Sequence, residues 1–283
     1  MSDFLEQMRL GSVARCAQAK SLRPQAELEQ RVRDMPSAPA LHLGKEGFDV
    51  IAEIKRRSPA EGPLATDNEN VHATIAQRAV TYARGGACAI SVLTEPERFD
   101  GDLSHVSVAS AAVESLGVPV MRKDFLVDPY EVFEARAAGA GGVLLITRML
   151  SDAQLGEMLD VAYGLGLFVL VEAFDAEDLK RSQAVATARN ATPLIGVNTR
   201  DLTTLEIDRS RLETLAPNYF DNVIAVAESG LAHPDDAGRV AGYGYRLGLV
   251  GTALMKSETP YELLQAMLWS GRTSGIHVAP GHA

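Results

Sequence analysis

Residues 118–146 read VPVMRKDFLVDPYEVFEARAAGAGGVLLI and contain two short apolar runs separated by one segment with helical spacing. The runs Val118–Met121 and Val143–Ile146 are typical of strands that are buried on both faces. Between them, Tyr130–Ala138 follows an Asp-Pro start signal and ends before Gly139, as a helix should. The stretch therefore predicts one strand–helix–strand unit of a parallel sheet.

The same alternation extends over most of the chain. Apolar runs of four to six residues occur at Val50–Ile54, Ala89–Leu93, Val118–Met121, Val143–Ile146, Phe168–Val171, Leu194–Val197, Val223–Ala227 and Leu247–Val250. Helical spacing between them occurs at His72–Arg84, Leu103–Leu116, Tyr130–Ala138, Asp152–Leu165, Ala176–Ala184 and Tyr261–Trp269, with shorter candidates at Ser210–Leu215 and Pro234–Ala241. Eight such units over roughly 220 residues match the usual size of a (β/α)8 barrel.

We therefore predict an α/β fold, a (β/α)8 TIM barrel with an N-terminal helical extension. The expected boundaries are a helical extension over residues 1–45 with a break at Pro24, a barrel over 46–269 and a flexible tail over 270–283. A doubly wound Rossmann sheet is the alternative. It is disfavoured because Gly242-Tyr-Gly244 has Leu247 where a dinucleotide-binding loop needs its third glycine.

Charge and composition exclude several classes of function. The 283 residues include 27 Lys and Arg and 37 Asp and Glu, which gives a formal net charge of −10. Such a chain has the wrong overall field for nucleic acid, and no apolar run approaches the ~18 residues that cross a bilayer, so we expect neither partner. The field would also repel a small anionic substrate, unless the basic residues gather in one place.

Compartment and metal content follow from a few residues. The first residues are acidic and unlike a signal peptide, and Cys16 and Cys88 are far apart in the sequence, so we expect reduced thiols in a cytoplasmic protein. A disulfide between the two cysteines is the alternative. The six histidines occur singly without metal-ligand spacing, so no metal is predicted.

Polar residues follow the predicted strands at the end where such barrels carry their active face. They are Glu53 and Lys55, Lys123, Glu172, Asn198 and Arg200, Glu228 and Ser229, and Gly251 and Thr252. Glu172 is the most suggestive, because a carboxylate after the run Phe168–Val171 is costly to bury without a partner. Gly230 and Gly251 follow the last two strands, where barrels often bind phosphate through backbone N–H groups.

Each of these residues alone also has a structural explanation. Glu53 and Lys55 could form an ion pair at the rim, Lys123 could be a solvated loop charge, and Asn198 with Arg200 could cap a turn. The glycines could simply make tight turns. Polar or ionisable side chains occur at five strand ends, which is more than is needed to solvate the rim of a barrel. The combination therefore favours a functional site. We expect Lys55, Arg57, Lys123 and Arg200 to form a small positive well within an acidic surface.

Several of these segments, taken in order, resemble the indole-3-glycerol phosphate synthase family. They are Val50–Pro59, Leu93–Glu95 with Phe99–Gly101, Arg122–Phe125 with Asp128–Tyr130 and Glu134–Arg136, Val171–Glu172, Gly196–Leu202 and Ala227–Leu231. The resemblance implies a (β/α)8 barrel and a cofactor-free, ring-closing decarboxylation in tryptophan biosynthesis. The implied partner is a small phosphorylated substrate, 1-(2-carboxyphenylamino)-1-deoxyribulose 5-phosphate.

The resemblance also implies roles for individual residues. Lys123 would be the general acid at the ribulose carbonyl and Glu172 the acid/base for later proton transfers, while Lys55, oriented by Glu53, would reach the phosphate or the departing hydroxyl. How the acid role divides between Lys55 and Lys123 stays open. The implied catalytic residues are Glu53, Lys55, Lys123, Glu172, Asn198 and Ser229. The implied substrate-binding residues are Ser58, Phe99, Phe125, Arg200, Glu228, Gly230, Gly251 and Thr252.

Within that second set, Phe99 and Phe125 would enclose the anthranilate ring. Arg200, with Asn198 and Ser58, would hold the carboxylate and the sugar hydroxyls. Gly230, Gly251 and Thr252 would bind the phosphate.

The chain departs from the family pattern at a few positions. Ser58-Pro59-Ala60-Glu61-Gly62 stands where the family commonly has Ser-Pro-Ser, a basic residue and Gly, which puts the first loop and substrate affinity in question. Thr252 replaces a usual serine, and Phe174 replaces a common polar residue.

Two other functions are disfavoured by the sequence. A phosphoribosylanthranilate isomerase would need a Cys/Asp pair at strand ends, but Cys88 opens its strand. A non-catalytic paralogue would be expected to lack Lys123 or Glu172, and both are present. We expect a monomer or a weak homodimer.

Overall fold

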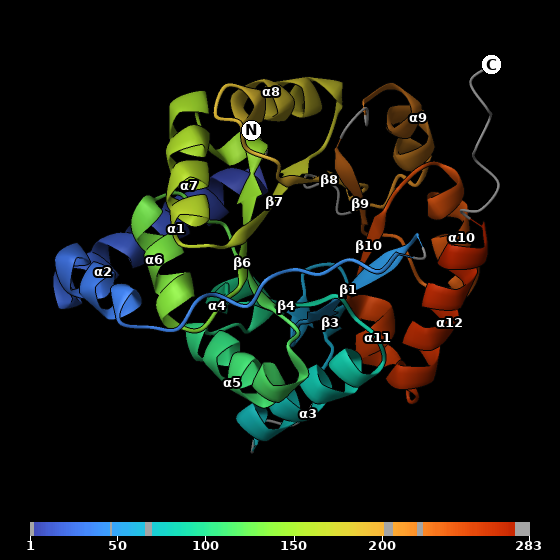
Figure 1. Cartoon of the computed structure of the whole chain (residues 1–283), viewed down its shortest axis with the longest axis horizontal. Coiled ribbons are helices and arrows are strands. Elements are labelled where there is room, and N and C mark those ends of the chain that lie inside the picture. The colour runs from blue at the N-terminus through green and yellow to red at the C-terminus, as the bar shows by residue number, and fades with distance from the viewer. Residues whose placement is uncertain (1–2, 46, 66–69, 201–205, 220–222, 275–283) are drawn as a thin grey trace.

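The computed structural model describes residues 3–45, 47–65, 70–200, 206–219 and 223–274, and its main feature is a closed barrel of parallel strands (Figure 1). In order around the barrel these are β1 (Asp49–Ile54), β4 (Ala89–Leu93), β5 (Val120–Lys123), β6 (Gly142–Ile146), β7 (Phe168–Ala173), β8 (Leu194–Asn198), β9 (Ile224–Glu228) and β10 (Leu247–Val250). The pairing of β10 with β1 closes the ring. The predicted barrel and its eight strands are confirmed.

Local chemistry sets the strand boundaries. β5 begins and ends two residues later than predicted, because Pro119 has no N–H to donate to the ladder and the strand starts at Val120. Both faces of the strands are covered, and Val50, Ile51 and Ala52 have no exposed surface. Burial on both faces is the reason that the strands read as apolar runs.

Helices cover the outside of the barrel (Figure 1). They are α3 (Val71–Arg84), α5 (Leu103–Val113), α6 (Pro129–Ala137), α7 (Asp152–Gly164), α8 (Ala176–Thr187), α9 (Ser210–Tyr219), α10 (Pro234–Gly242) and α12 (Pro260–Ser274). The Asp-Pro start signal of α6 acts as expected, because Asp128 and Glu131 form a capping box there. Ser151 and Gln154 form a second capping box at the start of α7.

Short elements that the sequence pattern did not predict lie among the loops. They are the strands β2 (Arg57–Ser58) and β3 (Gly62–Pro63), the helices α4 (Pro96–Phe99) and α11 (Thr252–Lys256), and the 3-10 turns η1 (Glu114–Leu116) and η2 (Thr147–Met149). β2 and β3 pair as an antiparallel hairpin directly after β1. Apart from η1, which extends α5, these elements follow the carboxyl ends of barrel strands.

The helix α12 extends into the segment predicted to be a tail. Its buried Gly271 packs on the ring of Phe48, and Arg272 donates to the Phe48 carbonyl over 3.1 Å and pairs with Asp49 over 2.9 Å. Residues 270–274 are therefore helical and docked, contrary to the prediction, because these contacts lie outside any local pattern. Residues 275–283 lie outside the described part of the chain.

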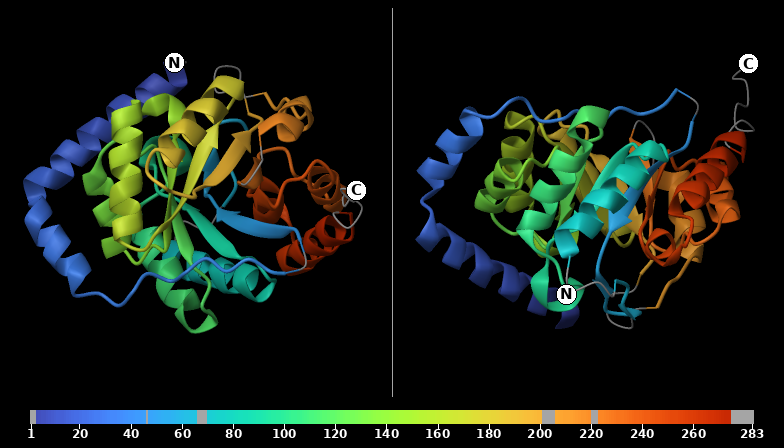
Figure 2. Two further views of the ribbon diagram at one scale, coloured as in Figure 1. Left: turned by 45° about the horizontal axis from the view of Figure 1, so that its top comes forward. Right: turned by 90° about the horizontal axis from the view of Figure 1, so that it is seen from below.

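The N-terminal extension consists of α1 (Asp3–Leu22) and α2 (Gln25–Arg33), with the predicted break at Pro24. Both helices lie along the side of the barrel near α6 (Figure 2). Ser12 Oγ donates to Glu131 Oε1 over 2.8 Å, and Arg15 pairs with Asp124 over 3.0 Å. These contacts dock α1 against the segment that follows β5.

No helix in the described ranges is long and apolar enough to cross a membrane. The thiols of Cys16 and Cys88 are both free, so the two residues form no disulfide.

Candidate active site

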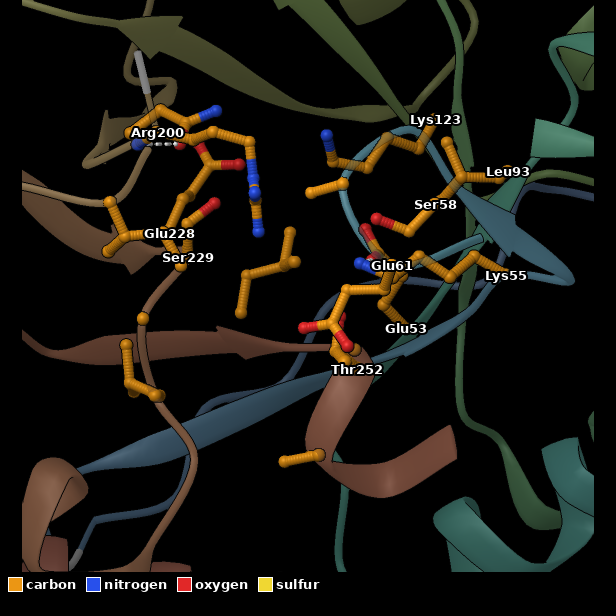
Figure 3. Close-up of a pocket in the computed structure, with 18 of the residues that line it drawn as sticks. Glu53, Lys55, Ser58, Glu61, Leu93, Lys123, Arg200, Glu228, Ser229 and Thr252 are labelled. Carbon is orange, nitrogen blue, oxygen red and sulfur yellow. Dashed lines mark hydrogen bonds and ion pairs between the residues drawn. The ribbon is translucent and has the colours of Figure 1, made fainter. Parts of the chain in front are cut away.

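A cavity of about 590 Å³ opens at the carboxyl ends of the strands. Every residue predicted to be catalytic or substrate-binding lines it: Glu53, Lys55, Ser58, Phe99, Lys123, Phe125, Glu172, Asn198, Arg200, Glu228, Ser229, Gly230, Gly251 and Thr252. Figure 3 shows Arg200 and Glu228 on one side and Lys123 on the other, with their side chains directed into the shared space. The barrel thus brings together residues that end or follow different strands, although they are up to 199 positions apart in the sequence (53 to 252).

Two lysine–carboxylate pairs form the floor of the cavity. Lys55 Nζ lies 2.9 Å from Glu53 Oε1, and Lys123 Nζ lies 3.5 Å from Glu172 Oε2. The side chains of Glu53 and Glu172 are almost completely buried, so the ammonium groups offset the cost of removing these carboxylates from water. This pairing explains how the Glu172 carboxylate can be buried near the end of the apolar strand β7.

The charge of Lys123 is secured by its surroundings. Burial opposes the charge, but the carboxylates of Glu172, Glu53 and Glu228 raise the pKa of Lys123 above the ordinary lysine value. Lys123 therefore carries a proton at neutral pH, which a general acid requires. With 17% of its side chain exposed, it is no solvated loop charge.

The Glu53 carboxyl stays ionised although it is buried. Burial raises its pKa, but the charges of Lys55 and Lys123 outweigh that effect and hold the pKa below the ordinary glutamate value. The predicted orientation of Lys55 by Glu53 matches this close ion pair.

Asn198 holds Glu172 in place from the neighbouring strand. Its Nδ2 donates to Glu172 Oε1 over 3.1 Å, and its Oδ1 accepts from the Arg200 backbone N–H over 2.9 Å. One amide thus orients both the Glu172 carboxylate and the backbone of Arg200, the second residue after β8. Sequence patterning placed Asn198 at the mouth but could not show that its partner is Glu172.

Glu228 is the third buried carboxyl group of the site. Among the described residues neither of its side-chain oxygens has a hydrogen-bond partner. Burial and the nearby Glu172 carboxylate raise the pKa of Glu228 well above the ordinary value, which favours its neutral form. The group fits against Gly196, because a Cβ there would lie 1.9 Å from Glu228 Oε1.

Gly251 makes room for the first ion pair. A Cβ at this position would lie 2.2 Å from Glu53 Oε1 and 3.1 Å from Lys55 Nζ. Besides its predicted role in phosphate binding, Gly251 is needed because a side chain at this position would collide with the Glu53–Lys55 ion pair. No sequence pattern indicates this second requirement.

An aromatic row lines another part of the cavity. The rings of Phe99 and Phe125 lie 6.1 Å apart between centroids at a tilt of 40°, and Phe4 meets the edge of Phe125 at 6.0 Å. Phe4 also lines the cavity, together with Leu144 of β6. Phe4 was not predicted to line the cavity, because a residue more than 40 positions before the first strand reaches the mouth only through the docking of α1.

The lining is more evenly charged than the predicted positive well. Among the described residues it has five Lys or Arg and five Asp or Glu, namely Lys55, Lys123, Arg200, Arg209 and Lys256 against Glu53, Glu61, Asp124, Glu172 and Glu228. Arg57, predicted to belong to the well, is not among the described lining residues and pairs with Asp100 over 3.5 Å. Glu53, Glu172 and Glu228 lie on β1, β7 and β9 and were expected at the mouth, whereas Glu61 and Asp124 come from the segments after β1 and β5 and add two acidic residues to the lining.

The remaining expectations concern residues around the site. Cys88 precedes β4 and donates to the Val50 carbonyl over 3.3 Å, so it is no strand-end partner for an aspartate. Phe174 is buried beneath the Arg148 guanidinium, 4.9 Å from the ring centroid. No group of three or more His, Cys, Asp or Glu within the described ranges could hold a metal ion. Asp201 and Leu202 of the resemblance lie outside those ranges.

Comparison with known proteins gives one consistent result. A family model described as "Indole-3-glycerol phosphate synthase" matches residues 5–267. A protein of that name from a Nocardioides species is 43% identical over 253 residues, 89% of this chain and 92% of the relative. One from Azospirillum brasilense is 39% identical over 274 residues, 95% of this chain and 100% of the relative.

Solved structures share the fold at low sequence identity. A thiamine phosphate pyrophosphorylase from Pyrococcus furiosus has a TM-score of 0.58 at 15% identity, and covers 81% of this chain and 97% of its own. A 3-hexulose-6-phosphate synthase from Salmonella typhimurium has a TM-score of 0.59 at 15% identity, and covers 80% and 100%. At such identities the likeness concerns the barrel alone.

Proposed function

The chain belongs to the indole-3-glycerol phosphate synthase family, and from this premise we propose which of its residues carry the reaction. The enzyme is a carboxy-lyase of tryptophan biosynthesis. It converts 1-(2-carboxyphenylamino)-1-deoxyribulose 5-phosphate to indole-3-glycerol phosphate, carbon dioxide and water by ring closure, decarboxylation and dehydration.

Lys123 is the general acid for ring closure. As the aromatic carbon attacks the ribulose carbonyl, negative charge develops on the carbonyl oxygen, and a proton from an ammonium group neutralises it. The raised pKa of Lys123 keeps that proton available, and the Glu172 carboxylate 3.5 Å away stabilises the ammonium. This pair is the observation that carries the proposal.

Glu172 is the acid/base for the proton transfers that follow ring closure. Forming the aromatic indole requires a base that removes a proton, and loss of the hydroxyl as water requires an acid, so the Glu172 carboxylate would take up the first proton and then return it to the departing hydroxyl. Glu172 is buried, faces Lys123 and accepts from Asn198, so it is held in the position that both steps need. Asn198 is a positioning residue that acts through Glu172.

Lys55 is the second ammonium group on the cavity floor. We assign it to the phosphate or to the departing hydroxyl, with Glu53 keeping it in place over 2.9 Å. Ser229 and Glu228 follow or end β9 and line the same space. A neutral Glu228 would limit repulsion of an anionic substrate.

Different lining residues of the cavity are assigned to different parts of the substrate. Arg200 suits the planar carboxylate, with Ser58 beside the sugar hydroxyls, and Phe99 and Phe125 supply apolar surface for the anthranilate ring. The backbone N–H groups of Gly230, Gly251 and Thr252 would hold the phosphate. The ring centroids of Phe99 and Phe125 lie 6.1 Å apart, so enclosing a third ring between them requires one of them to turn.

The test is a turnover assay with purified protein. Wild type should convert the substrate to the fluorescent indole product, and Lys123→Ala should lower kcat by roughly 10²–10⁴-fold. The matched control is Lys180→Ala, at an exposed position on α8, which should leave turnover unchanged. Undiminished turnover by Lys123→Ala would refute the assignment, and the same assay on Lys55→Ala measures its share of the acid role.

Apart from residues 270–274, which belong to α12, the domain boundaries stay predictions, as do the cytoplasmic location and the monomer or weak homodimer. Light scattering across a concentration series would test the last of these.

A further inference from the structure

The hairpin β2–β3 brings an unexpected acidic residue to the cavity. Glu61, just before β3, stands where the family pattern commonly has a basic residue, and it lines the cavity. Its carboxylate forms an ion pair with Lys256 Nζ, at the end of α11. The pair joins the segments that follow β1 and β10, which are neighbouring strands of the barrel.

Lys256 lies on the same helix as Thr252, which belongs to the proposed phosphate site. It lies four residues after Thr252 on α11, and residues four apart share one face of a helix. Helical side chains also lean toward the N-terminus of their helix, which here is the Gly251–Thr252 end. Lys256 itself lines the cavity, with 55% of its side chain exposed.

The Glu61 carboxylate interacts electrostatically with the same cationic side chains that would bind the anionic substrate. The hydrogen bond from Lys256 lowers the pKa of Glu61, and the charges of Lys256, Arg200 and Lys55 act in the same direction. Glu61 is therefore ionised at neutral pH and occupies, as an anion, the edge of the space meant for an anionic substrate.

We propose that Lys256 is a further phosphate-binding residue and that Glu61 is the counter-ion it exchanges for the substrate phosphate. The inference rests on the proposed phosphate site at Gly230, Gly251 and Thr252. A partly exposed ion pair is weak, so a phosphate carrying up to two charges can displace the Glu61 carboxylate. Because substrate and product both carry the phosphate, Glu61 weakens the binding of both.

The kinetic test uses three variants and a double variant. Glu61→Gln should lower KM about three- to fivefold, and Lys256→Gln should raise KM about five- to tenfold, each with kcat changed less than KM. Glu157→Gln, on the exposed face of α7, changes the net charge equally and should leave KM unchanged. In the Lys256→Gln background, the gain from Glu61→Gln should be lost.

Three results would overturn the inference. Wild-type KM in both single variants would show that the pair does not meet the phosphate. A gain from Glu61→Gln that persists without Lys256 would show direct repulsion rather than exchange. A raised KM with a lowered thermal midpoint in Glu61→Gln would show that Glu61 merely supports the hairpin.

Calorimetry of inorganic phosphate binding gives a readout that needs no turnover. Compared with wild type, Glu61→Gln should bind phosphate more tightly, Lys256→Gln more weakly and Glu157→Gln equally. Absence of turnover in wild type would count against the proposed function, whereas this series tests the exchange regardless. Equal phosphate affinity in all four proteins would overturn the exchange.

Discussion

Replacing Asn198 by aspartate tests how strongly the cavity depends on one neutral amide. The change keeps size and shape, and a carboxylate can still accept from the Arg200 backbone N–H. It removes the Nδ2–H donor that lies 3.1 Å from Glu172 Oε1 and puts a second acceptor in its place. Two buried carboxylates would then face each other.

The cost can be worked from that distance. Two unit charges 3.1 Å apart repel by about 5 kcal/mol at an effective dielectric of ~20, although protonation of one of them limits the penalty. Asn198→Ala loses only a hydrogen bond to a charged group, about 1.5–3 kcal/mol, or roughly 10–150-fold in rate. We expect kcat to fall roughly 10³-fold in Asn198→Asp at alkaline pH, where both groups are charged.

The assay is kcat against pH, followed by the fluorescence of the indole product. At lower pH the introduced carboxyl group, once protonated, would donate to Glu172 as the amide does. As pH is lowered, the loss of kcat relative to wild type should therefore become smaller for Asn198→Asp, while the loss for Asn198→Ala stays nearly constant. Asn190→Asp makes the same chemical change in an exposed turn outside the cavity and should have no effect.

The reasoning fails if Asn198→Asp is no slower than Asn198→Ala at alkaline pH. It also fails if the deficit of the aspartate variant does not depend on pH. Thermal midpoints of all three variants would separate these outcomes from a general loss of folding.

Three further changes probe the buried groups. Gly196→Ala should lower the free energy of unfolding by about 1–3 kcal/mol, because the new Cβ would lie 1.9 Å from Glu228 Oε1; an unchanged urea midpoint would contradict this. Because the pKa of Glu228 is raised in the folded protein, its neutral form stabilises the fold at acid pH, and this stabilisation is lost as pH rises and the group ionises. The thermal midpoint of the wild type should therefore fall as pH rises, and Glu228→Gln should make that fall smaller. Asp124→Asn should lower the free energy of unfolding by about 1.5–3 kcal/mol, because it removes the carboxylate 3.2 Å from buried Arg122, which keeps Glu134 at 3.4 Å. It should also speed proteolysis within α1, which Arg15 ties to Asp124, and equal proteolysis would argue against that tie.

The sequence by itself determined the barrel and the position of its active face. Strands buried on both faces must be apolar throughout, so Val143–Ile146 and its seven counterparts could be recognised one at a time. The carboxyl ends of parallel strands meet at one rim, so residues such as Lys123 and Glu172 could be placed together before any distance was known. The helix start at Asp128 was equally local.

Only the tertiary structure decided which of these residues touch. Asn198 pairs with Glu172, Glu61 pairs with Lys256, and Phe4 reaches the cavity because α1 docks beside α6. The protonation of Glu228 likewise depends on burial and on a carboxylate from another strand. Hydrophobic periodicity reports whether a residue is buried, but a contact between distant segments depends on the summed packing of whole elements, and a buried charge depends on every group around it.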